Sequence, residues 1–194
     1  AAELVGEVAV AVLLAPGQDE RVAERPVRDD VPALHGVVGD DAAAFAAVED
    51  DQTIKLVAAT DESVLYAGAK KFTIDLNGQT WTWNGGQTGN YAALKVFGGA
   101  ADITIVDGDE EGNGKMYAAG NGFCVWAKTG KVTINSGKFY NNSNDDYAIY
   151  VNGTAAVVIN GGEFRNEMDA PYIWKGDLAK LNLNIENNNA NASI

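Results

Sequence analysis

Apolar and polar residues alternate in a short stretch that recurs through the second part of the chain. The starts of the copies lie 31, 29, 25 and 24 residues apart: FTIDLNG from Phe72, ITIVDG from Ile103, VTINSG from Val132, VVINGG from Val157 and LNLNIEN from Leu181. TIKLVA at Thr53 is a candidate for one more copy. A period of two is typical of a strand with one buried face, so the apolar side chains of each copy are expected to face a core.

A second strand-like stretch recurs between these copies, at spacings of 30, 25 and 24 residues: ALKVFGG from Ala93, FCVWAKTG from Phe123, AIYVNGT from Ala148 and YIWKGD from Tyr172. A third short piece, such as TWTW, KFYN or EFRN, follows the first stretch. The connecting pieces are short and rich in Gly and Asn, which argues against helical crossovers. Because one repeat cannot bury its apolar face alone, the pattern predicts an all-β solenoid in which equivalent strands stack in parallel.

Turn residues follow the first stretch at regular places. Gly78, Gly137 and Gly162 lie where a corner requires a positive φ or a close approach of the backbone. Amide side chains occupy equivalent positions of successive repeats, where stacked amides can form a hydrogen-bonded ladder: Asn135, Asn160 and Asn184.

The stretches TIDLNGQTWT, VTINSGKF and VVINGGEF resemble the repeats of right-handed parallel β-helix proteins of the pectate-lyase-like superfamily. DDAAAFAAVEDD, followed by TIKLVA, is similar to the capping helix and first coil with which many such domains begin. The resemblance covers residues 40–194 and implies an all-β fold, a right-handed single-stranded parallel β-helix of about five to six short coils. The matching residues are structural, so the resemblance predicts a fold more strongly than an activity.

The first part of the chain has a different composition, without Asn or Trp. We therefore divide the chain into an N-terminal attachment or oligomerisation segment, residues 1–39, and a β-helix domain, residues 40–194. The capping helix is expected at about 41–50, where Asp residues can cap its start. Phe45 and Val48 are expected to form its apolar side.

The charge balance narrows the range of partners. The formal net charge is −13, from 14 basic and 27 acidic residues, which argues against nucleic acid and anionic membrane surfaces. We expect no membrane insertion, because the apolar run near the start is too short to span a bilayer and carries Glu3 and Glu7. The single cysteine, Cys124, is expected to be buried, and the single histidine, His35, leaves no convincing His-based triad or multi-His metal site.

Candidate catalytic and metal-binding residues are sparse. A polysaccharide lyase or hydrolase needs clustered carboxylates or a calcium-assisted base, but the position after the first stretch carries mostly amides. Glu163 and Arg165 in EFRN are the remaining pair, with solvated surface residues as the alternative interpretation. In DGDEEGNG, Asp107, Asp109 and Glu111 alternate as in part of a calcium-binding loop, although the closing Glu is missing. A solvated turn is the alternative there, and calcium is the single candidate cofactor.

Aromatic residues are the other candidates for a binding site. Tyr140, Tyr147, Tyr150 and Trp174 are candidate carbohydrate-binding residues, because sugar rings stack on exposed aromatic rings. Tyr150 alternates with two apolar neighbours and is expected to face outward. Packing in the core and contact with another subunit are the alternatives for these rings.

The resemblance and the two-part layout together imply a class of function. Solenoids of this kind are common on virions and bacterial surfaces, and phage proteins often join a small attachment region to one. We expect a non-catalytic structural or adhesive protein on the virion surface, such as a phage capsid decoration or head fibre that binds host-associated glycans. The expected partners are further copies in a homotrimer and a capsid or other virion shell protein bound through residues 1–39. A polysaccharide lyase or hydrolase and an extracellular or bacterial cell-surface β-helix module are the alternatives.

Overall fold

The computed structural model describes residues 33–35, 41–85, 91–120, 122–142, 147–166, 183–185 and 191–193. Most of the expected attachment segment and the candidate residue Trp174 lie outside these residues. The described part is rich in β-strands, and every sheet in it is parallel, as the repeats predicted.

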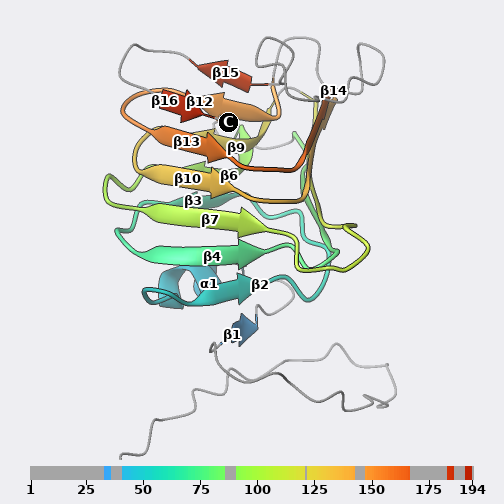
Figure 1. The fold of residues 1–194 in the computed structure, drawn as a ribbon, viewed down its shortest axis with the longest axis horizontal. Helices are drawn as coiled ribbons and strands as arrows, with labels where there is room; N and C mark the ends of the chain where they lie inside the picture. The colour runs from blue at the N-terminus through green and yellow to red at the C-terminus, as the bar shows by residue number, and fades with distance from the viewer. Residues whose placement is uncertain are drawn as a thin grey trace, which may run out of the picture.

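The strands form three sheets, called A, B and C (Figure 1). Sheet A has the order β1 (Ala33–His35), β2 (Thr53–Lys55), β4 (Lys71–Asp75), β7 (Asp102–Val106), β10 (Lys131–Ile134), β13 (Ala156–Ile159) and β16 (Asn191–Ser193). Sheet B has the order β14 (Glu163–Asn166), β11 (Lys138–Asn142), β8 (Lys115–Ala119) and β5 (Thr80–Trp83). Sheet C has the order β15 (Leu183–Ile185), β12 (Ile149–Val151), β9 (Phe123–Ala127), β6 (Ala92–Val96) and β3 (Val64–Tyr66).

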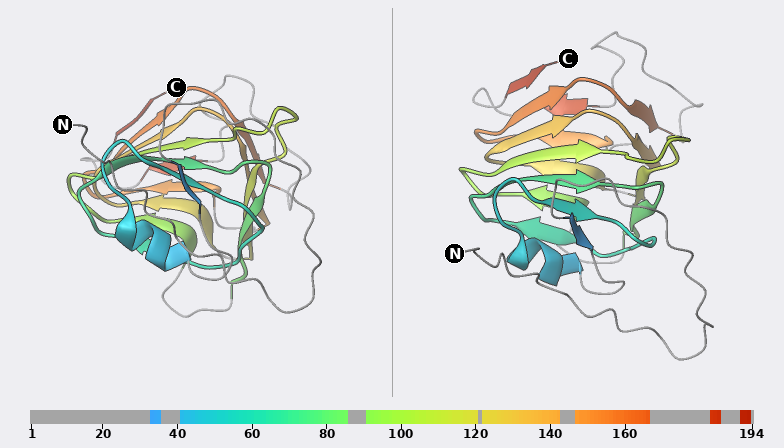
Figure 2. Two further views of the ribbon diagram at one scale, coloured as in Figure 1. Left: turned by 90° about the horizontal axis from the view of Figure 1, so that it is seen from below. Right: turned by 60° about the horizontal axis from the view of Figure 1, so that its bottom comes forward.

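From β2 onward, consecutive strands of the chain belong to different sheets. After β4 in sheet A the chain enters β5 in sheet B and β6 in sheet C, and it returns to sheet A as β7, beside β4. The same order repeats from β7 to β10 and from β10 to β13. Each pass therefore lays its strands alongside those of the preceding pass, and the strands rise in layers (Figure 2).

The alternating apolar residues of the first stretch lie in register along sheet A. Ile105, Ile134 and Ile159 occupy opposite positions on β7, β10 and β13, and all three are fully buried. On sheet B the rings of Phe139 and Phe164 stack with centroids 5.1 Å apart. Burial of a large apolar side chain contributes about 1.5–3 kcal/mol, so stacking one pass on the next stabilises both.

The first and last expected copies of the repeat lie in different sheets. TIKLVA is a copy of the first stretch, because Ile54 of β2 lies opposite Ile74 of β4. The assignment of LNLNIEN to the same series is wrong: its residues Leu183–Ile185 form β15, which pairs with β12 in sheet C. The place beside β13 in sheet A belongs to β16. Alternation identifies a strand but not the sheet that it joins.

The expected register of sheet C is also wrong by one residue. Leu94 of β6 lies opposite Val125 of β9, which in turn lies opposite Ile149 of β12. The amides of Cys124 and Val125 both donate to the carbonyl oxygen of Ala148, at 2.8 and 3.2 Å. Two residues opposite one form a bulge, and the spacing of the repeats does not reveal it.

The corners after sheet A follow the expected turn chemistry. The φ angle is positive at the three glycines singled out there: Gly78 (73°), Gly137 (106°) and Gly162 (108°). The expected amide ladder is present for one pair, because Asn160 Nδ2 donates to Asn135 Oδ1 at 2.8 Å. Asn184 does not continue that ladder, since it lies in sheet C opposite Tyr150.

Helix α1 (Asp41–Ala47) covers the end of the stack beside β3 (Figure 2). It ends at Ala47, so the expected range 41–50 is too long. Phe45 and Val48 are buried as expected. The Phe45 ring contacts three core rings, at centroid distances of 6.2, 5.8 and 5.9 Å: Tyr66, Phe72 and Trp81. The helix thus shields apolar side chains at this end of the stack.

Candidate functional site

The outer face of sheet C carries a cluster of aromatic rings, Phe97, Phe123, Trp126 and Tyr150, here called the aromatic face. Tyr150 points away from the core as expected, because both of its neighbours in β12 are fully buried. Trp126 lies opposite Tyr150, and both side chains are half-buried. The Tyr150 ring stacks on Phe123 with centroids 4.6 Å apart, and it lies 5.6 Å from Trp126. Phe97 meets Trp126 edge-on at 5.0 Å.

Polar and charged side chains hold the aromatic face in place. The indole nitrogen of Trp126 donates to Asn152 Oδ1 at 3.1 Å, and Asn152 Nδ2 lies 3.4 Å from the Tyr150 hydroxyl oxygen, which accepts from it. The Lys128 ammonium lies 5.3 Å from the centroid of the Phe97 ring. Side chains that are already fixed lose less conformational entropy when a ligand binds, so these contacts favour a binding role.

The sequence identified Tyr150 but missed its aromatic neighbours. Phe123 and Trp126 are three residues apart, and strict alternation would place them on opposite faces of a strand. The bulge at Cys124 changes this, and the two rings lie 6.3 Å apart. No pattern in FCVWAKTG marks that bulge, so the aromatic face could not be assembled from the sequence.

Two of the other aromatic candidates, Tyr140 and Tyr147, do not belong to the aromatic face. Tyr147 precedes β12 and is 37% exposed. Trp174 lies outside the described residues. Tyr140 belongs to β11 in sheet B, so the structure places it on a different sheet from Tyr150.

Tyr140 is part of a polar cluster on sheet B. Its hydroxyl donates a hydrogen bond to the Glu163 carboxylate, and the Arg165 guanidinium lies 5.5 Å from the centroid of its ring. Burial, and then the bond to Glu163, raise the pKa of the Tyr140 hydroxyl to about 12. Tyr140 is only 9% exposed, which leaves little of its ring for a sugar. These contacts give Tyr140 a structural role and use the Glu163 carboxylate as an acceptor.

The acidic turn between β7 and β8 uses its carboxylates within the fold. Asp107 accepts hydrogen bonds from a backbone amide of the corner after β4 and from the amide of Gly114, at 2.9 and 2.6 Å. Asp109 and Glu111 both accept from the side-chain amide of Asn113, at 2.9 and 3.1 Å. Among the described residues, no group of three or more His, Cys, Asp or Glu could hold a metal ion. The calcium interpretation therefore receives no support from these contacts.

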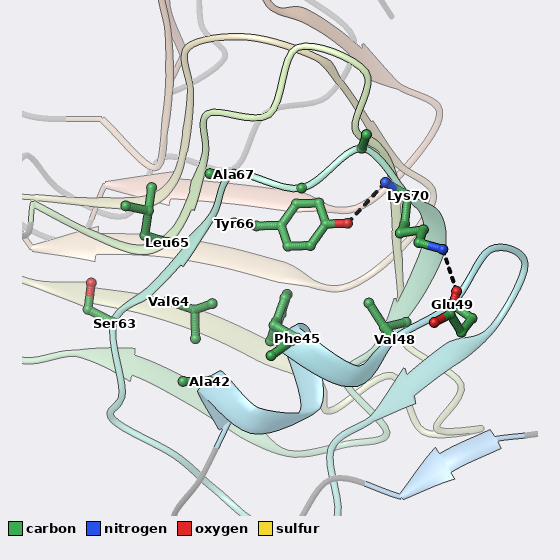
Figure 3. Close-up of a pocket in the computed structure, with 13 residues that line it drawn as sticks. Ala42, Phe45, Val48, Glu49, Ser63, Val64, Leu65, Tyr66, Ala67 and Lys70 are labelled. Atoms are coloured by element: carbon green, nitrogen blue, oxygen red, sulfur yellow. Dashed lines mark hydrogen bonds and ion pairs between the residues drawn. The ribbon is translucent and has the colours of Figure 1, made fainter.

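A cavity of about 410 Å³ opens between α1 and β3 at the end of the stack (Figure 3). Its walls combine apolar side chains with polar groups, and the Phe45 and Tyr66 side chains lie between the helix and the strand (Figure 3). At the rim the Lys70 ammonium pairs with the Glu49 carboxylate, and the Lys70 amide donates to the Tyr66 hydroxyl at 3.0 Å. Because the two charges neutralise each other, the cavity resembles a packing gap beneath a short helix more than a catalytic cleft.

Comparisons with known proteins point to no function for this chain, so a functional proposal rests on the surfaces described above. The chain matches no protein-family model, no curated protein and no solved structure. In the described ranges, no helix is long and apolar enough to cross a membrane.

Proposed function

We propose that this chain is a non-catalytic adhesive protein that binds carbohydrate through the aromatic face of sheet C. The proposal includes a finer view of the fold, in which the three parallel sheets are the sides of a right-handed single-stranded parallel β-helix. Two observations support that view: the repeated order of the sheets along the chain, and the resemblance of the repeats to this fold.

The aromatic face carries the proposal. Trp126 and Tyr150 stand on the side of sheet C that is turned away from the core, where burial of the core does not require large rings. Aromatic rings present flat apolar surfaces that suit the apolar faces of sugars. Asn152 holds both rings before a ligand arrives, and Phe123 packs against Tyr150. A ligand that stacks on Tyr150 and Trp126 would therefore meet a fixed platform.

An exterior location is the second part of the proposal. A phage capsid decoration or head fibre suits a solenoid domain, 40–194, joined to an attachment segment, 1–39, that binds a virion shell protein. A homotrimer is the proposed assembly. The support for this part is the resemblance of the repeats and the change of composition along the chain.

A glycan array tests the binding. We expect the full chain to bind a subset of neutral glycans and Tyr150→Ala to weaken that binding by about tenfold, because the lost ring contact is worth about 0.5–1.5 kcal/mol beyond its buried area. The matched control is Tyr117→Ala, which removes a half-buried ring from sheet B and is expected to keep the binding. A chain that binds no glycan, or equal binding by wild type and Tyr150→Ala, contradicts the proposal.

A carbohydrate-active enzyme is the main competing function. A lyase would release unsaturated sugar from polygalacturonate or alginate. If the chain does so, and Glu163→Gln or Arg165→Ala abolishes the release, the chain is a lyase and the adhesive function is wrong. The location has a separate test. Sedimentation of the protein with phage particles supports a virion protein, whereas sedimentation with bacterial envelope fractions alone supports a cell-surface module.

A further inference from the structure

Two lysines lie side by side on the outer face of sheet B. Lys115 of β8 is opposite Lys138 of β11 in a parallel ladder. Neighbouring strands are about 4.8 Å apart, and like charges directly opposite each other destabilise a sheet. An anion placed between the two ammonium groups would remove this repulsion.

Among the described residues, no ion pair joins a carboxylate to Lys115 or Lys138. The ion pairs found there join other lysines to acidic residues: Lys55 to Asp75, Lys70 to Glu49, Lys71 to Asp51 and Lys131 to Asp102. Glu163 continues the column beside Lys138, but its carboxylate is directed to the Tyr140 hydroxyl and forms no ion pair with Lys138. Lys115 lies 5.4 Å from the centroid of the Tyr117 ring, a contact that leaves its charge uncompensated. In a chain with 27 acidic and 14 basic residues, two adjacent lysines that form no ion pair with the described residues point to an external anion.

We propose that Lys115 and Lys138 form a subsite for a phosphate group carried by a sugar or a polyol. A phosphate ester has a charge of about −1.5 to −2 near neutral pH, which matches two ammonium groups, whereas a carboxylate carries a single charge. Thr80 of β5 continues the column beside Lys115, and its hydroxyl can donate to a further phosphate oxygen. The subsite is separate from the aromatic face, and it rests on the proposed function only because a bound glycan would supply the phosphate.

Calorimetric titration of the full chain at low ionic strength tests the subsite, with glucose 6-phosphate, glucuronate and glucose as probes. We expect glucose 6-phosphate to bind, and glucuronate to bind about tenfold more weakly or not at all. Lys115→Ala and Lys138→Ala are each expected to weaken the binding of glucose 6-phosphate by about tenfold, because hydrogen bonds to charged groups are the stronger kind. The matched control is Lys131→Ala, which removes the same charge from a lysine that already pairs with Asp102. It is expected to bind glucose 6-phosphate as the wild type does.

Three results of the titration would overturn the phosphate subsite or a part of it. Equal affinity for glucuronate and glucose 6-phosphate overturns the assignment to phosphate. An equal loss in Lys131→Ala shows an effect of net charge and overturns the subsite. Tyr150→Ala is expected to keep the binding of glucose 6-phosphate, so failure of the aromatic face leaves this subsite intact. Neutral glycan binding without any binding of glucose 6-phosphate refutes the subsite alone.

Discussion

The ring of Tyr150 stacks on the ring of Phe123, with centroids 4.6 Å apart and planes inclined by 19°. The two residues come from the neighbouring strands β12 and β9 of sheet C. Their contact lies within the aromatic face, where Trp126 also meets both rings, at 6.3 Å from Phe123 and 5.6 Å from Tyr150. A change at any one of these rings is therefore expected to affect the others.

Asn152→Ala is expected to lower the free energy of unfolding by about 1 kcal/mol, because the indole N–H of Trp126 loses its acceptor. The same change is expected to weaken glycan binding, since the Trp126 ring is no longer fixed. Urea denaturation and the glycan array measure the two effects. Asn135→Ala is the control, because it removes an exposed amide that accepts a hydrogen bond from Asn160 at the edge of sheet A, whereas the aromatic face lies on sheet C. Loss of glycan binding in the control as well would contradict the role of Asn152.

Ile134→Ala is expected to destabilise the fold by about 2–5 kcal/mol, because it leaves a cavity in a fully buried column between two other passes. Thr133 is the matched control, since it is the neighbouring residue of β10 and its side chain is half-buried. Thr133→Ala is expected to cost less than about 1 kcal/mol. Urea denaturation measures both variants, and similar costs would show that the side chain of Ile134 is not in the core.

Gly137→Ala is expected to destabilise the fold by about 1 kcal/mol or more. Its φ angle of 106° is strained for a residue with a side chain, and the added methyl carbon would lie 2.9 Å from Leu76 Cδ1. Gly99→Ala is the control, because nothing lies within 4 Å of its added methyl carbon and its φ angle is not in the left-handed region. Thermal unfolding compares the two variants. An unchanged midpoint for Gly137→Ala would argue against this corner geometry.

The sequence predicted the parallel stacking of the strands but not the composition of the aromatic face, and the reasons are physical. Buried residues such as Ile105 and Ile134 recur in a constant pattern, and each stacks on its equivalent, so alternation and spacing suffice to place them. The aromatic face depends on the shared acceptor at Ala148, which moves Phe123 and Trp126 onto one side. That bulge is a property of paired strands, and a single stretch of sequence carries no sign of it.

Stability is expected to fall as the pH rises from about 10 to about 12, in part because of Tyr140. Its hydroxyl has a pKa of about 12 in the folded chain, against 10.0 for an ordinary tyrosine. The folded state therefore keeps this proton where the unfolded state releases it, so the contribution is complete below pH 10 and is lost by about pH 12. Tyr140→Phe is expected to remove this part of the pH dependence. Urea denaturation between pH 9 and 12 measures it, and an identical slope in both proteins would contradict the assignment.

Calcium is expected to leave the thermal midpoint unchanged. The carboxylate of Asp107 already accepts amide hydrogens through both oxygens, and the Asp109 carboxylate already accepts from the Asn113 amides. A metal ion would have to displace these bonds. Thermal unfolding with added calcium and with a chelator tests this. A saturable rise in the midpoint that Asp107→Asn removes would restore the calcium interpretation.

The acidic turn also has a consequence for engineering. Three residues, 135–137, join β10 to β11, whereas eight residues, 107–114, join β7 to β8 at the equivalent corner. The ladders on both sides keep their registers despite this difference in length. Glu110 and Glu111 at the tip of the longer turn are exposed. The tip is therefore a permissive position for displaying a foreign peptide, because additional chain there leaves the strand pairing unchanged.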